Sequence, residues 1–425
     1  MVAPDFADAL AACIPGFAAS ADHERVTLIL ADTLCSALAA EALAAVEDNI
    51  LTRAAGLASA AGPVTAWGTG VKGALEAIAL RNGVATRHLD YNDTYTGKVI
   101  VHPSDMIATL VGLAEARQID WPRLIEAVAV AYETLCLLAD QSQTRRNGFD
   151  PATLIPLAVA AGAGHLLGLQ AGVIADAIRL AALDASVLRC IRLGKIADWR
   201  AVAAARNAVK ALLAVSMAEA GTQGPPGTFE SEDGFFAHIS GPLAVDVVPA
   251  PRFGQVLTKR FPAQIFIQSY LDLAEAIHGE LKGSAADIVG VTIATNAEAV
   301  RMVGPRPAHA TLNRETADHS AAFCVASMLV TGRFGPDDLD HHLANETILA
   351  TAGQTTMEIL PEGTPRHAAV VTARLSDGRV IERRREAPEP PSRQRLAYKL
   401  DTLWPRERKR DWAWTLPGEA PAFPG

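Results

Sequence analysis

Apolar residues recur every three or four positions through much of the first half of the chain. The pattern is clear in residues 124–138, 155–167, 173–183 and 202–217, with short Gly, Asp or Pro breaks between them. This spacing places the apolar side chains on one face of a helix. Alanine, the best helix former, is abundant. Only 5% of the residues are aromatic, so we expect helices that pack closely through small side chains.

The pattern changes near residues 250–260. Residues 287–295 are β-branched and alternate as in a strand. Ser376-Asp377-Gly378 separates two further β-rich stretches, which predicts a hairpin closed by an Asp-Gly turn. Helical spacing occurs between these strands, at 264–281, 317–332 and 337–353.

These patterns predict a mainly α protein with two domains. We expect a large all-helical domain over residues 1–258, a smaller α+β lid domain over residues 259–391, and a return of residues 392–425 to the helical domain. A chain of 425 residues is long enough for two such cores.

Composition excludes several classes of protein. The net charge of −9 argues against nucleic acid as a partner. The five cysteines are scattered without a CxxC pair, so neither a disulfide framework nor a typical metal–cysteine site is expected. We therefore predict no cofactor and no metal. The cysteines are Cys13, Cys35, Cys136, Cys190 and Cys324.

We expect neither a membrane anchor nor a secretory leader. The N-terminus lacks a basic stretch before an apolar run. The most apolar segment, residues 154–169, contains Pro156 and His165 and is typical of a buried helix. We expect a cytoplasmic protein that does not bind membranes. Because its Ala-rich helices carry few charges on several faces, we also expect a homodimer.

The densest group of polar residues lies between two apolar helical patterns, within residues 81–108. The first helix is expected to end near Asn82-Gly83, and Ser104 is expected to cap the next. Loops on a rigid scaffold often carry catalytic residues. Asp and Asn also favour turns, so residue types alone leave a structural role open. The group comprises His88, Asp90, Asn92, Asp93, Thr94, Thr96, Lys98 and His102.

The order of these residues, LDYNDT followed by HPSD, resembles the signature of the MmgE/PrpD family. That family includes 2-methylcitrate dehydratases and cis-aconitate decarboxylases. The resemblance implies that Asp90, Thr94 and His102 line an active site. Further similar segments, among them GTQGP and RETADHS, extend it over nearly the whole chain. It implies a large helical domain, an α+β lid and a dimer.

Two segments of the second half resemble the dehydratase branch of the family. Gln268 lies at a position where dehydratases have Gln and decarboxylases have His. Gln264, like Gln268, is Gln rather than the His of the decarboxylases. The RETADHS segment implies that His319 and Ser320 are substrate-binding residues, and we predict the same role for Gln268. Phe323 departs from the family, in which many members have Tyr.

An anionic substrate requires cations in a protein that is acidic overall. The resemblance places a basic residue on the helix around residue 206. The alignment favours Arg206, and Lys210 lies one turn later on the same face. Lys259 is a third candidate for binding carboxylates. The adjacent pair Arg145-Arg146 is typical of surface, although it also suits a carboxylate.

Dehydration of a β-hydroxy acid needs a base for the carbon-bound proton and an acid for the leaving hydroxide. We predict Asp90 as the base, His102 as the acid, with the reverse assignment open, and Thr94 as an orienting group. The predicted function is a metal-independent hydro-lyase for a citrate-like di- or tricarboxylic acid. The alternatives are a decarboxylase or isomerase of an aconitate-like acid, and a catalytically inactive dimeric binding protein.

Overall fold

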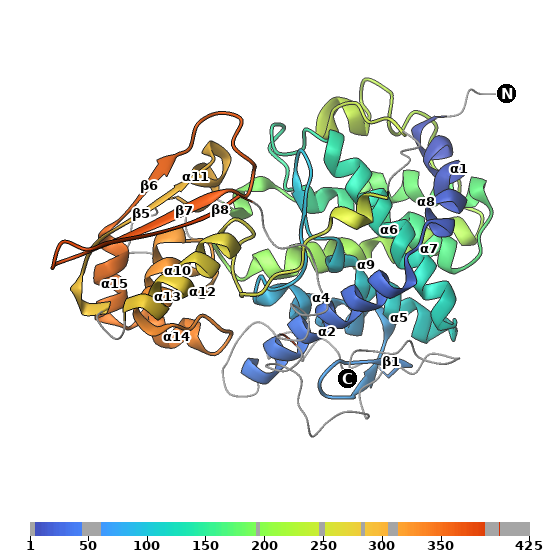
Figure 1. Ribbon diagram of the computed structural model, residues 1–425. Coiled ribbons are helices and arrows are strands. Elements are labelled where there is room, and N and C mark those ends of the chain that lie inside the picture. Colours follow the sequence, from blue (N-terminus) through green and yellow to red (C-terminus); the bar gives the residue numbers. More distant parts are fainter. Residues whose placement is uncertain are drawn as a thin grey trace.

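The computed structural model shows two lobes, each with its own hydrophobic core (Figure 1). The first core contains residues from Phe6 to Val256, and the second contains residues from Phe261 to Leu375. The predicted mainly α class is confirmed. The structure describes residues 5–44, 61–192, 196–245, 251–281, 285–304, 313–386 and 399.

Long helices build the first lobe. Extensive contacts join α6 with α7, α4 with α9, α8 with α9, and α7 with α8. Two short antiparallel strand pairs lie between the helices in sequence. They are β1 (Val64–Thr65) with β2 (Lys72–Gly73), and β3 (Tyr95–Thr96) with β4 (Ile100–Val101). The helices are α1 (Phe6–Ala19), α2 (His23–Ala44), α4 (Leu75–His88), α5 (Ile107–Arg117), α6 (Trp121–Gln141), α7 (Ile155–Leu166), α8 (Ala171–Leu183) and α9 (Trp199–Glu219).

Small residues allow these helices to approach closely, as the alanine content predicts. A Cβ atom added at Gly83 would lie 2.8 Å from the Cβ of Ala205, which places Gly83 at the contact between α4 and α9. Gly83 therefore serves packing inside the helix. The prediction that α4 ends near Asn82-Gly83 was wrong, since the helix continues to His88.

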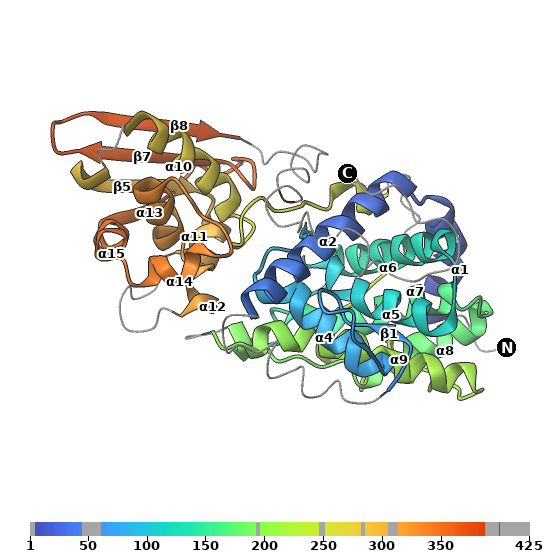
Figure 2. The same ribbon diagram turned by 90° about the horizontal axis from the view of Figure 1, so that it is seen from below.

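The second lobe is a four-stranded sheet, in the order β6-β5-β7-β8, with α10 and α13 beside it (Figure 2). Strand β5 (Ile288–Thr295) pairs in parallel with β6 (Thr355–Ile359) and antiparallel with β7 (Ala369–Leu375), which pairs with β8 (Val380–Arg385). The predicted strand and Asp-Gly hairpin are confirmed; β6 was not predicted. The helices are α10 (Ile267–Leu281), α11 (Ala297–Val303), α12 (Arg314–Ala317), α13 (Ala321–Thr331), α14 (Asp338–Leu343) and α15 (Glu346–Gly353).

The two cores divide between Val256 and Phe261, close to the predicted boundary at 258/259. The boundaries themselves, and the role of the second lobe as a lid, stay predictions. Of the predicted C-terminal return, Lys399 alone lies within the described residues. Its buried ammonium donates to Asp32 Oδ1 (2.7 Å) and to the carbonyl oxygen of Tyr91 (2.7 Å). Lys399 therefore contacts both α2 and the polar segment, the residues that follow α4 from Leu89 to His102.

Two helices are long and apolar enough to cross a membrane by length and composition. In α2 the apolar stretch is 83% buried inside the protein, as in a core helix. In α9 it is 56% buried, which leaves apolar residues such as Leu213 on the surface.

Candidate active site

The polar segment begins where α4 ends. Leu89 follows the helix, and Asp90 has a φ of 48°, in the left-handed region that residues other than Gly rarely adopt. Thr94 then pairs with Leu257 through two backbone hydrogen bonds of 2.8 Å. This pairing holds the segment against the strand-like chain that precedes Lys259. Asp90 lies on a loop, as predicted, and this loop is packed inside the fold, since Asp90 is buried.

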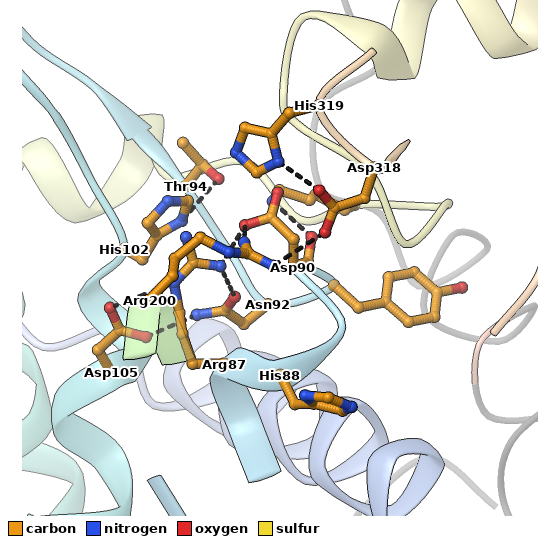
Figure 3. A network of polar contacts seen from close by, with 12 residues as sticks. Arg87, His88, Asp90, Asn92, Thr94, His102, Asp105, Arg200, Asp318 and His319 are labelled. Carbon is orange, nitrogen blue, oxygen red and sulfur yellow. Dashed lines mark hydrogen bonds and ion pairs between the residues drawn. The ribbon is translucent and has the colours of Figure 1, made fainter. Parts of the chain in front are cut away.

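Three cations from three parts of the chain surround the Asp90 side chain, and Figure 3 labels two of them, Arg87 and Arg200. Arg87 forms an ion pair with it from the last turn of α4. Arg200 Nη1, from the start of α9, lies 3.1 Å from Oδ1. Lys259 Nζ donates to Oδ2 (2.8 Å) and to the Asp90 carbonyl oxygen (2.6 Å).

These cations decide the charge of Asp90. Burial alone would raise its pKa, but Arg87, Lys259, His319 and Arg200 together hold the pKa well below its usual range. An ionised carboxylate with such partners has little tendency to accept a proton. The geometry therefore favours a binding and positioning role for Asp90 over the predicted role as base.

Arg200 connects the two lobes. Its buried guanidinium donates to Glu315 Oε2 through Nε (2.7 Å) and to Asp318 Oδ2 through Nη2 (2.9 Å). Both carboxylates lie on or just after α12, in the second lobe, whereas Asp90 lies in the first. Asp318 in turn contacts the Nδ1 atom of His319, which places that imidazole beside the same network.

Arg206 and Lys210 do not reach this network. A residue six positions along a helix points about 240° away from the first, so Arg206 and Arg200 face different directions. Arg206 is exposed and shares a separate surface groove with Glu76 and Lys210. Lys210 pairs with Asp184 at 2.8 Å. The structure thus corrects the predicted position of both residues, and Arg200 is the cation that α9 contributes.

His102 has a defined tautomer. Its Nδ1 lies 2.7 Å from the Asp93 carbonyl oxygen and 3.1 Å from Thr94 Oγ1. Since a carbonyl oxygen only accepts hydrogen bonds, Nδ1 carries the proton and Nε2 keeps its lone pair. Burial, Arg87 and Lys259 hold the pKa of His102 well below its usual value. His102 is thus a neutral imidazole at neutral pH, and its unprotonated Nε2 has no proton to donate but can accept one, which favours the role of base over that of acid.

Asp93 fixes the backbone that holds His102. Its Oδ1 accepts from Ser104 Oγ (2.6 Å) and from the Ser104 amide (3.0 Å), and its Oδ2 accepts from Tyr132 Oη (2.8 Å). Ser104 is therefore occupied by Asp93 and does not cap a helix as predicted; a 3₁₀ turn, Pro103–Met106, precedes α5 instead. Thr94, fully buried behind the imidazole, orients His102 rather than a substrate.

Asp105 differs from Asp90 in having weaker cationic contacts. Arg87 Nε is 3.9 Å from its Oδ2, beyond hydrogen-bond reach, and Asn92 Nδ2 donates to its Oδ1 at 3.0 Å. Burial and the nearby Asp93 and Asp90 outweigh the effect of Arg87 and raise the pKa of Asp105 to about 7. Near neutral pH this side chain carries a proton for part of the time, so it has the property that a general acid needs.

These groups meet at a cavity of about 280 Å³ between the lobes. Residues of both lobes line it, among them Arg87, Asp90, His102 and Asp105 from the first and Gln264 and His319 from the second. Within the described ranges, no group of three or more His, Cys, Asp or Glu side chains is arranged to hold a metal ion. The predicted absence of a metal stays a prediction.

The other predicted site residues have structural contacts. Lys259 lies behind Asp90 rather than on the cavity wall. Gln268 binds the backbone of Phe261 through both its amide oxygen and its amide nitrogen (3.0 Å each). Ser320 caps α13. Phe323, at the position of the family Tyr, is packed in the second core and does not line the cavity.

The sequence patterns did not indicate Arg87, Arg200 or Asp318 as site residues. They also did not indicate a chemical role for Asp105. One local signal was available, because Arg87 precedes Asp90 by three positions, a spacing that brings side chains together at a helix end. For Arg200 the contacting residues are more than 100 positions away in the chain, at separations of 110, 115 and 118.

Two family models together match most of the chain. The model of the MmgE/PrpD N-terminal domain matches residues 9–247, and the model of the MmgE/PrpD C-terminal domain matches residues 261–404. A 2-methylcitrate dehydratase of Cupriavidus necator is 26% identical over 343 residues, which cover 72% of this chain and 68% of that protein.

Two further relatives have the same name. The 2-methylcitrate dehydratase of Escherichia coli is 26% identical over 299 residues, covering 63% of this chain and 59% of the relative. The mitochondrial 2-methylcitrate dehydratase of Yarrowia lipolytica is 28% identical over 297 residues, covering 63% and 55%. The chain thus matches between 55% and 68% of the length of these three relatives.

Proposed function

Because the chain belongs to the MmgE/PrpD family, we propose that it is a hydro-lyase that removes water from a citrate-like di- or tricarboxylic acid. The relatives named 2-methylcitrate dehydratase make 2-methylcitrate the first substrate to test. One observation carries the proposal: a neutral imidazole with an unprotonated Nε2, His102, and a carboxyl with a pKa of about 7, Asp105, line the same cavity.

The chemistry needs only these two proton carriers. His102 Nε2 takes the proton from the carbon next to a carboxylate, and the electron pair of the C–H bond forms the C=C bond. The C–O bond of the hydroxyl group breaks, and Asp105 donates its proton so that water leaves rather than hydroxide. His102 then carries one proton more and Asp105 one fewer, and exchange with solvent restores both.

Charge develops on the substrate carboxylate as the carbon-bound proton leaves. Arg87 lines the cavity and is the cation nearest to both acidic residues, since it pairs with Asp90 and lies beside Asp105. A preorganised guanidinium stabilises such charge without reorganising solvent. Asp90 acts through Arg87, Arg200 and Lys259, which it holds in place.

His319 is the second imidazole of the cavity. Asp318 contacts its Nδ1, and burial lowers the pKa of His319 although Asp318 and Asp90 act in the opposite direction. In our proposal this neutral ring binds the substrate hydroxyl group. His319 keeps the role of a substrate-binding residue that the resemblance implied.

The test is incubation of the purified protein with 2-methylcitrate, citrate and cis-aconitate. We expect ultraviolet absorbance from a new C=C bond with the first or second acid, no carbon dioxide, and a loss of turnover in His102→Gln. Carbon dioxide from cis-aconitate would establish the decarboxylase alternative. No product from any of the acids, with binding retained, would favour the inactive binding protein.

A further inference from the structure

Five arginines line the cavity, and three of them have no ion-pair partner among the residues that the structure describes. Arg87 pairs with Asp90, and Arg192 Nε lies 2.8 Å from Asp150 Oδ2. The three without such a partner are Arg145, Arg189 and Arg301.

Arg145 is the most enclosed of these three side chains. It lies in the turn after α6 and is half-buried, whereas Arg189 and Arg301 are exposed. The contact found for its guanidinium is Met302 Sδ, 3.7 Å from Nη1, and a thioether is a weak acceptor. Burial and the nearby Arg189 lower the pKa of Arg145. A partly buried cation in this position is stabilised by an anionic ligand.

The remaining two arginines approach Arg145 from both lobes. Arg189 Nη1 lies 3.3 Å from the Arg145 carbonyl oxygen, which keeps these two residues of the first lobe adjacent. Arg301 comes from α11 of the second lobe and precedes Met302, the residue that Arg145 contacts. Arg145 and Arg189 are therefore adjacent, and Arg301 lines the same cavity from the second lobe, next in sequence to the residue that Arg145 contacts.

The charge of the cavity wall is positive in an acidic protein. Three aspartates, Asp90, Asp105 and Asp150, face the five arginines, which leaves a surplus of two positive charges even with every aspartate ionised. The whole chain has a net charge of −9. This surplus matches a ligand with more than one carboxylate.

We infer that Arg145, Arg189 and Arg301 form an outer subsite that binds a carboxylate distant from the reacting carbon. The ligand that this subsite fits has a carboxylate group in addition to the one beside the reacting carbon. This inference rests on the proposed function for its reaction, but the subsite itself binds anions without catalysis.

The experiment measures binding of propane-1,2,3-tricarboxylate and of the dicarboxylate glutarate by calorimetry. Neither probe has a hydroxyl group, so neither can be dehydrated. We expect Arg145→Gln and Arg301→Gln to weaken binding of the tricarboxylate about 10- to 150-fold, the equivalent of one charge-assisted hydrogen bond. Glutarate binding is expected to change less, so the preference for the third carboxylate falls.

Arg146→Gln is the matched control, because Arg146 adjoins Arg145 but is exposed and does not line the cavity. This variant should bind both probes like the parent, and melting curves should show that all three variants fold. Unchanged preference in Arg145→Gln and Arg301→Gln, or an equal loss in Arg146→Gln, would overturn the subsite. Arginine-dependent binding in a protein that dehydrates no acid would support the subsite and refute the proposed function.

Discussion

Replacing Asp90 with Asn separates its positioning role from a role as base. The amide has the shape of the carboxylate, and Asn tolerates the φ of 48° found here. The change therefore removes one negative charge and little else. It leaves Arg87, Arg200 and Lys259 around a neutral group in the buried interior.

The size of the effect follows from the burial of these partners. Asp90, Arg87, Arg200 and Lys259 are each 1% exposed or less. Removing one member of a buried ion pair costs about 3–5 kcal/mol of unfolding free energy, because it leaves a charge uncompensated. Lys259, with a pKa of about 8, can limit the loss by releasing its proton. We therefore expect a loss near 3 kcal/mol at neutral pH.

The pH dependence has a defined sign. Asp90 in the parent has a lowered pKa, so its stabilisation is present above its usual pKa near 4 and disappears as the pH falls further. In Asp90→Asn the buried Lys259 loses the carboxylate that raised its pKa. The loss of unfolding free energy caused by the unpaired charge of Lys259 is then largest at low pH. It becomes smaller as the pH rises, because the amine becomes neutral. The deficit should be larger at pH 6 than at pH 9.

The assay is urea unfolding of the parent, Asp90→Asn and His102→Gln. We expect His102→Gln to lose about 1 kcal/mol, the worth of one hydrogen bond, while kcat falls roughly 10²–10⁴-fold. Adding Lys259→Met to Asp90→Asn should recover stability. If Asp90→Asn had the same unfolding free energy as the parent, Asp90 would not stabilise the buried cations. If His102→Gln kept the full kcat, His102 would not be the base.

Three further predictions follow from the site and from the surface. The pKa of about 7 for Asp105 predicts that kcat of the parent falls as the pH rises above 7. In Asp105→Asn we expect kcat to be about 10²–10⁴-fold lower and to lack this decrease above pH 7. A kcat of the parent that did not change with pH would contradict the acid role of Asp105. We propose that a second copy covers the exposed Leu213 and Met217 of α9, 69% and 45% exposed, so light scattering should give a dimer for the parent and a monomer for Leu213→Glu. A chelator should leave kcat unchanged, whereas stoichiometric iron by elemental analysis would require another mechanism.

Local patterns predicted much of the fold, because helix period and turn residues act within a few positions. The hairpin around Gly378 is such a case. Strand β6 escaped prediction because it is a short edge strand, and none of its five residues is buried. On α9, periodicity identified the helix but not which cation meets a partner, since Arg200 and Arg206 both occur among alanines. That choice depends on Glu315 and Asp318, which the chain brings near only after folding.

Most of the site residues found from the sequence lie together in the segment from Asp90 to His102, and His319 was found through the RETADHS segment. Their order carries the resemblance, and contact along the chain keeps them together in space. Their roles were less predictable, because a role depends on protonation and hence on burial and neighbours. The tautomer of His102 depends on the Asp93 carbonyl oxygen, a backbone atom that no residue pattern indicates.

Asp90 and Asp105 illustrate how one residue type serves two purposes in this cavity. Both are buried, and burial by itself would raise the pKa of each carboxyl group. Asp90 has three cations within ion-pair distance and remains charged, whereas Asp105 has Arg87 at 3.9 Å and a neutral amide and keeps its proton up to about pH 7. Pairs of groups whose environments separate their pKa values are typical of acid–base sites. Arg87 pairs with Asp90 but lies beyond hydrogen-bond reach of Asp105, and this difference helps to keep Asp90 charged and leaves Asp105 able to carry the proton.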